Sequence, residues 1–88
     1  MKYAIAWPRP TKLKVESWSL PPEIEISVVE TIDDRIVRDN GETTTIWFDA
    51  FLTDPASGQF FDLHVWAAYT FDSGTAVVTD VGCDVLSE

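Results

Sequence analysis

The sequence is poor in the residues that build covalent or metal-bound cores. It contains one cysteine, Cys83, and one histidine, His64, among 88 residues. One cysteine cannot close an intramolecular disulfide, and this pair cannot supply the four ligands of a structural zinc site. We therefore predict no metal and no cofactor, and we expect Cys83 to lie on the core side of a sheet as an unreactive thiol.

Positive charge is missing from the second part of the chain. All six Lys and Arg residues lie within residues 1–38, where six Asp and Glu balance them, whereas residues 39–88 carry nine acids and no Lys or Arg. The whole formal charge of -9 thus belongs to residues 39–88. Direct binding to nucleic acid needs Lys and Arg against phosphate, so the sequence excludes it. The distribution indicates a surface that meets a basic protein, or simply a well-solvated acidic surface.

Long hydrophobic runs are also missing. No stretch approaches the ~20 apolar residues that span a bilayer, and the start of the chain is too short for a secretory signal. We predict a cytoplasmic protein, in the host cell cytoplasm if a phage encodes it, with no membrane partner. The content of 45% hydrophobic and 12% aromatic residues favours a folded chain, and we predict one small acidic β-domain over residues 1–88.

Most of the second part of the chain has the pattern of β-strands. β-branched and aromatic residues alternate with polar ones in three segments, which are residues 43–52, 60–71 and 75–86. Turn-forming residues separate the segments. A loop at 55–58 pairs Leu52 with Phe61, Ala50 with Leu63, Phe48 with Val65, and Ile46 with Ala67. A three-residue loop at 72–74 pairs Tyr69 with Val77, Val65 with Val81, Leu63 with Cys83, and Phe61 with Val85.

Residues 23–38 fit two structures. Ile24, Val28, Ile32 and Ile36 recur every four residues behind two prolines, as in an amphipathic helix. The same segment is rich in Ile, Val and Thr and alternates at even positions, as in a strand. As a strand joined by a loop at 39–41, it pairs Ile36 with Thr44, Ile32 with Phe48, and Val28 with Leu52. As a helix, it covers the core face of the sheet.

The predicted fold class follows from these segments. We predict an all-β protein, or a β-rich α+β protein if residues 23–38 are a helix. The expected architecture is a single antiparallel meander of four strands, curled or packed as a sandwich, with an N-terminal strand at residues 12–18.

The registers place aromatic and acidic side chains together on the face opposite the core. Trp47 is expected opposite Trp66, Asp49 opposite His64, Phe51 opposite Asp62, His64 opposite Gly82, Trp66 opposite Asp80, and Asp84 opposite Asp62. Aromatic anchors ringed by charge are typical of protein interfaces. The predicted partner-binding residues are Trp47, Asp49, Phe51, Phe60, Asp62, His64, Trp66, Asp80 and Asp84. Alternatively, the N-terminal segment covers this face with Trp7, Trp18, Lys12 and Lys14.

Catalytic motifs are missing as well. Asp49 and His64 could orient one another, but no motif places a Ser or Cys nucleophile or an oxyanion loop beside them. A cross-strand ion pair explains the two residues better. The acids near residues 33–42 lack the ligand spacing of a calcium-binding loop. We predict no catalytic residue and no enzyme.

The functional prediction is therefore an interaction. The acidic surface is interpreted as a non-enzymatic inhibitor or decoy that blocks a basic, nucleic-acid-binding site of a nuclease or CRISPR effector, as phage-encoded inhibitors and immunity proteins do. The alternative is a small assembly subunit, for example of a phage particle, or a homo-oligomer that buries its aromatic face. A small-molecule binder inside a curled barrel is a third interpretation.

Overall fold

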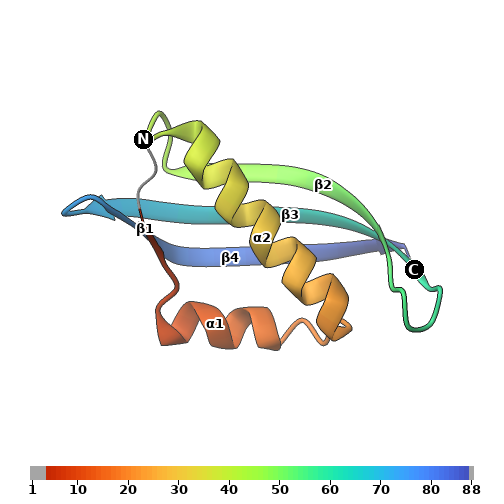
Figure 1. Ribbon diagram of the computed structural model, residues 1–88. Helices are drawn as coiled ribbons and strands as arrows, with labels where there is room; N and C mark the ends of the chain where they lie inside the picture. Colours follow the sequence, from red (N-terminus) through yellow and green to blue (C-terminus); the bar gives the residue numbers. More distant parts are fainter. Residues whose placement is uncertain (1–3, 88) are drawn as a thin grey trace.

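The computed structural model describes residues 4–87 as one mixed sheet, with one helix across a face of the sheet and a second helix along its edge (Figure 1). The chain forms β1 (Ala4–Ala6), α1 (Arg9–Glu16), α2 (Pro22–Asp39), β2 (Thr45–Thr53), β3 (Phe60–Asp72) and β4 (Thr75–Ser87). The sheet has the order β1-β4-β3-β2 and curls into a half-barrel. No helix in the described part of the chain is both long and apolar enough to cross a membrane.

The fold class is β-rich α+β, which was the second of the two sequence-based options. The strands β2, β3 and β4 form the antiparallel meander that the turns predict. The prediction of a purely antiparallel sheet is wrong, because β1 pairs with β4 in parallel. A strand of three residues is too short to produce an alternating pattern, so no periodicity indicates β1.

Residues 23–38 belong to a helix, and the strand interpretation of this segment is wrong. Pro22 occupies the first turn, where its missing N–H costs nothing, and Glu23 and Glu25 complement the positive end of the helix dipole. Asn40 ends the helix in the left-handed conformation. The β-branched residues lower the helix propensity, but packing against the sheet outweighs that cost. The apolar stripe that faces the sheet is fully buried at Val28, Ile32 and Ile36 and almost so at Ile24.

The N-terminal strand predicted at residues 12–18 is wrong as well, since α1 occupies most of this segment. Its buried residues are Thr11 and Val15, one helical turn apart, while Leu13 is exposed. The Thr11 hydroxyl donates a hydrogen bond of 2.7 Å to the carbonyl oxygen of Val78. This bond places α1 along β4, beyond the three residues that pair with β1.

The pairing of β2 with β3 follows the predicted register throughout. Leu52 pairs with Phe61, Phe48 with Val65, and Ile46 with Ala67, all on the core face. The buried Asp54 organises the connecting loop: its carboxylate accepts hydrogen bonds from the Ala56 N–H and the Ser57 hydroxyl. The turn residues therefore determine the register, because a one-residue slip would turn every apolar side chain away from α2.

The pairing of β3 with β4 differs from the predicted register in two ways. The loop has two residues, Ser73 and Gly74, both with positive φ, and not three. This shortening puts Tyr69 opposite Val78 in place of Val77. An irregularity after Ala68 leaves Thr79 unpaired and returns the later residues of β4 to the predicted face. The buried residues of β4 are accordingly Ala76, Val78 and Val81.

The Asp39 carboxylate joins the end of α2 to the sheet. It accepts a short hydrogen bond from the Tyr69 hydroxyl, and bonds of 3.0 Å from the N–H and the hydroxyl of Thr43. These bonds favour the charged form, so the Tyr69 hydroxyl and then Thr43 hold the pKa of Asp39 below its usual value of 3.8.

We predict that Asp39→Asn lowers the free energy of unfolding at pH 7 by about 1 kcal/mol, the usual net contribution of one hydrogen bond. A group with a depressed native pKa stabilises the fold above its unfolded pKa and loses that contribution as the pH falls through the native pKa. The difference between variant and wild type should therefore shrink below pH 3.8. Urea unfolding at several pH values measures it, with exposed Glu42→Gln as the control. A difference that does not vary with pH would refute the role assigned to this carboxylate.

Candidate functional site

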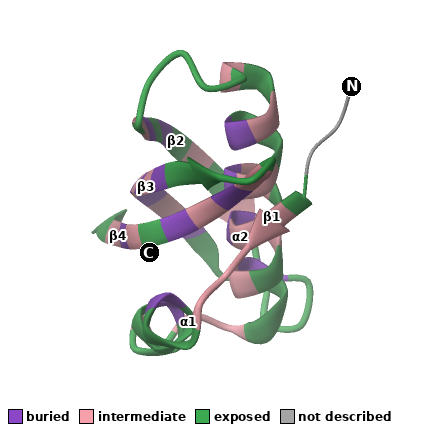
Figure 2. Cartoon of the chain, turned by 90° about the vertical axis from the view of Figure 1, so that its left-hand side faces the viewer, coloured by how far each residue is buried: buried purple, intermediate pink, exposed green. Residues whose placement is uncertain are grey.

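The side chains of the predicted partner-binding residues all lie on one face of the sheet, here called the outer face. Residues of β2 and β3 alternate between this face and the core, so that Ile46, Phe48, Leu63 and Val65 point to α2 and their neighbours point away. Within residues 4–87, no helix or strand packs over the outer face (Figures 1 and 2). The face consists of the side chains of Trp47, Asp49, Phe51, Phe60, Asp62, His64, Trp66, Asp80 and Asp84.

The N-terminal segment does not cover the outer face, so that alternative is wrong. Trp7 and Trp18 pack against the core cluster, and the Trp7 indole N–H donates a 2.8 Å hydrogen bond to Asp33 of α2. Lys12 lines a cleft between the helices. Lys14 alone reaches a residue of the outer face, where it forms an ion pair with Asp80.

Two tryptophans form the centre of the outer face. Trp47 lies directly opposite Trp66, as the sequence predicts, and its side chain is 66% exposed. Trp66 faces Gly82 and not Asp80, because of the irregularity in β4. A Cβ atom at Gly82 would overlap the Trp66 indole nitrogen and lie 2.8 Å from its Cζ2 atom. The missing side chain at position 82 therefore gives the indole room to lie against β4.

His64 lies between two aspartates. Its Nδ1 atom is 2.8 Å from Oδ1 of Asp49, which confirms the predicted cross-strand pair. On the other side its partner is Asp84, and not Gly82 as predicted. The prediction that Asp84 faces Asp62 is also wrong, because a second irregularity, between Asp62 and Leu63, pairs Asp62 with the backbone of Ser87. Among the described residues, the outer face gives this imidazole no Ser or Cys nucleophile to activate.

Phenylalanines form the third part of the outer face. Phe51 and Phe60 are 65% and 46% exposed, and their ring centroids are 5.9 Å apart. Asp62 lies directly opposite Phe51, as predicted. Leu86, near the end of β4, is also highly exposed; sequence reasoning missed it, and an irregularity in the β3–β4 register skips this residue.

The charge of the outer face is negative. Asp49, Asp62 and Asp84 come from strands that contain no Lys or Arg. Asp80 differs, because a hydrogen bond from the Lys14 ammonium lowers its pKa and the ion pair neutralises its charge. The three other aspartates thus supply the negative charge of the outer face, while Asp80 links β4 to α1 through its ion pair.

Cys83 is the nucleophilic side chain nearest to the outer face in sequence, between Gly82 and Asp84. Cys83 is half-buried against the core cluster, as predicted, and burial followed by the nearby Asp84 raises the pKa of its thiol to about 11. The thiol stays protonated and unreactive at neutral pH. Among the described residues, no group of His, Cys, Asp and Glu could hold a metal ion.

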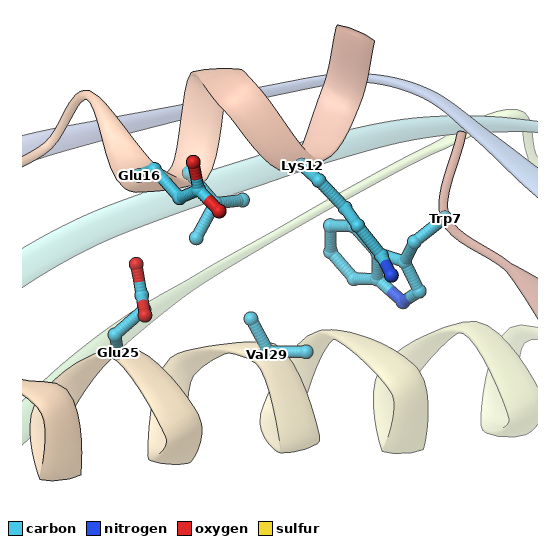
Figure 3. Close-up of a pocket in the computed structure, with 6 residues that line it drawn as sticks. Trp7, Lys12, Glu16, Glu25 and Val29 are labelled. Carbon is cyan, nitrogen blue, oxygen red and sulfur yellow. The ribbon is translucent and has the colours of Figure 1, made fainter. Parts of the chain in front are cut away.

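A cleft lies between the two helices, away from the outer face. This cleft has a volume of about 230 Å³, with Val15 and Val29 among its lining residues. Figure 3 shows Lys12 beside the Trp7 ring, and Glu16 and Glu25 at the other end. Burial raises the pKa of the neighbouring Asp33, although its bond from Trp7 opposes the shift. The three charged side chains of the cleft are exposed or half-buried, and none was predicted as a site residue.

No family model matches the sequence, and no curated protein matches it. Among solved structures, the fold resembles a chain of the toxin–antitoxin complex RelBE2 from Mycobacterium tuberculosis. The two chains are 17% identical, and the match covers 96% of this chain and 100% of that one with a TM-score of 0.53. At this identity the similarity concerns the fold.

The similarity overturns the functional prediction made from composition. The solved chain with this fold belongs to a toxin–antitoxin complex. The interpretation as a phage-type decoy for a nucleic-acid-binding site is therefore wrong. It rested on the absence of Lys and Arg from residues 39–88 and on the acidic and aromatic face, and such a surface attracts partners without identifying the class of protein.

Proposed function

We propose that this chain is the protein-binding member of a toxin–antitoxin type of pair, and that its outer face binds the partner protein. The observation that carries the proposal is an uncovered sheet face on which large aromatic side chains are exposed. Trp47 and Phe51 are each about two-thirds exposed, whereas Phe48, between them on β2, is buried. The similarity to a chain of a two-protein complex supports the same conclusion.

The energetics of the outer face suit a protein partner. Aromatic residues bury much apolar area at a small cost in conformational entropy, and they dominate the binding energy of interfaces. Contiguous exposed apolar patches are uncommon on proteins that act alone. Phe60, 46% exposed, enlarges the patch beside Phe51.

The charges of the outer face indicate the chemistry of the partner. Asp49, Asp62 and Asp84 surround the aromatic residues, so the complementary surface carries apolar side chains with Lys or Arg around them. RNA does not fit, since the strands of this face offer its phosphates no Lys or Arg. We therefore propose a binding role and no catalysis; the cytoplasmic location and single domain predicted from the sequence stay predictions.

The experiment is affinity capture of the partner from the native host with a double variant and a matched control. Trp47→Ala with Phe51→Ala should reduce the captured partner at least tenfold, because it removes the most exposed aromatic anchors. Leu13→Ala with Ile26→Ala should leave capture unchanged, since these side chains, both 51% exposed, lie on the helices. Equal capture by both double variants would contradict the assignment of the outer face.

A further inference from the structure

The strand β2 presents an open sheet edge. It is the terminal strand in the order β1-β4-β3-β2, and its 9 residues pair on one side only. The opposite edge is short at β1, and α1 runs along β4 beyond it. On the open side of β2, the Thr43 hydroxyl donates to the carbonyl oxygen of Thr45, and the part of the chain that the structure describes supplies no further hydrogen bond.

This edge lacks the features that keep sheet edges from pairing. In natural proteins, lysine, proline, a bulge or short length keeps an edge strand from pairing with another chain. β2 contains no Lys and no Pro, and its register with β3 runs unbroken from Thr45 to Thr53. Its one charge, Asp49, is already bonded to His64. An unprotected edge of this length is suited to receive a strand from another chain.

Charge indicates that the strand added to this edge comes from a different protein and not from a second copy of this chain. A second copy would bring another formal charge of -9 to the edge, and like charges disfavour the pair. A groove of about 370 Å³ lies at the start of β2, where Ile46 and Trp47 meet Arg35 and Arg38 of α2, and the carboxylates of Asp39 and Glu42 also line it. Arg35 lies 5.7 Å from the centre of the Phe48 ring, and Arg38 forms an exposed ion pair with Asp34. Arg35 and Arg38 thus bring positive charge to the helix side of the edge, next to the acidic Asp39 and Glu42, while the outer side is aromatic and acidic.

We infer that the partner protein adds an extended segment to the free edge of β2, with acidic side chains toward Arg35 and Arg38 and apolar or basic side chains beside Trp47 and Phe51. This inference rests on the proposed function and specifies how the partner binds. Backbone hydrogen bonds supply the attachment, and the alternation of side chains supplies the specificity. The two faces of β2 thus require opposite charges from successive residues of the same segment.

The probe is a synthetic peptide as long as β2, in which Glu alternates with Tyr and Lys. We expect ¹⁵N-detected titration to show binding, with slowed amide exchange in residues 46–53. Two control peptides carry N-methyl groups on alternate amides, one set on each side of the strand. One control should lose at least tenfold in affinity and the other should bind like the parent, because only one row of amides faces β2.

Protein variants test the charge pattern. Arg35→Glu with Arg38→Glu should weaken the parent peptide at least tenfold, and a peptide with Lys in place of Glu should restore binding to this variant. Equal binding of all three peptides, no binding by the parent, or a dimer of the free protein in sedimentation would overturn strand addition. If capture of the partner still depends on Trp47 and Phe51 in those cases, the proposed function stands while this inference fails.

Discussion

Ile32→Ala is expected to lower the free energy of unfolding by about 2–5 kcal/mol, whereas Ile26→Ala should change it by less than about 0.5 kcal/mol. The two residues have the same side chain and lie in the same helix, α2. Ile32 is fully buried against the sheet, while Ile26 is 51% exposed. Removing buried methyl groups costs their transfer energy and leaves a cavity, and neither applies at an exposed site.

This pair of variants separates the helix from the strand interpretation of residues 23–38. In a strand, positions 26 and 32 would lie on the same face, so both substitutions would have similar effects. In a helix, only the positions one turn apart from Ile32 share its burial, and Ile26 falls outside this stripe. Urea denaturation followed by circular dichroism measures both variants. A domain of this length has a total stability of about 4–13 kcal/mol, so the destabilisation by Ile32→Ala should be easily measured. Equal destabilisation by both variants would contradict the helix.

Gly82→Ala is expected to destabilise the protein by about 1–3 kcal/mol and to displace the Trp66 ring. A Cβ atom at this position overlaps the indole nitrogen of Trp66, so the ring must rotate off β4 or the strands must separate. The exposed control Asp84→Ala changes a neighbouring outer-face residue of β4 without adding an atom against Trp66.

The Trp66 indole N–H resonance and urea unfolding measure this prediction. A shifted resonance together with reduced stability is expected for Gly82→Ala, and neither is expected to the same extent for Asp84→Ala. Because Trp66 lies beside Trp47 at the centre of the outer face, the same variant should also weaken capture of the partner. An unchanged indole resonance in Gly82→Ala would show that the ring does not lie over position 82.

The β2–β3 register could be predicted from sequence because local chemistry and the hydrophobic pattern agree there. The loop at 55–58 and the alternation on both sides of it allow one register that places Phe48 and Val65 on the same face. The register of β4 could not be predicted fully. The two-residue loop shifts the first residues of β4 to the other face, and the irregularity at the unpaired Thr79 shifts the later residues back, so the hydrophobic alternation of most of the strand changes little. Only the packing of Val78 against the core distinguishes the alternatives.

The helices were harder to predict because tertiary contacts decide them. The β-branched residues of α2 favour a strand locally, and a buried stripe at every fourth position serves both structures. In α1 the alternation of Lys and apolar residues imitates an edge strand, although Leu13 is exposed and Thr11 is buried. Thr11 is buried because its hydroxyl reaches the Val78 carbonyl oxygen, a contact between residues far apart in sequence.

The membership of the outer face could be read from alternation, but its internal arrangement could not. The prediction grouped Asp49, His64 and Trp66 correctly, yet it put Gly82 beside His64. The position of Gly82 under Trp66 depends on the irregularity in β4, and the pairing of Asp80 with Lys14 depends on the place of α1. The open edge of β2 was missed because the strand prediction for residues 23–38 had covered it.

Amide hydrogen exchange on the captured complex tests the central claim most directly. We expect binding to slow the exchange of amides in β2 and of the neighbouring residues of β3, with α1 and the exposed side of α2 unchanged. Protection of β2 that disappears in the Trp47→Ala, Phe51→Ala variant would support the outer face as the partner-binding surface. Protection confined to α1 and α2, with β2 exchanging as in the free protein, would contradict it.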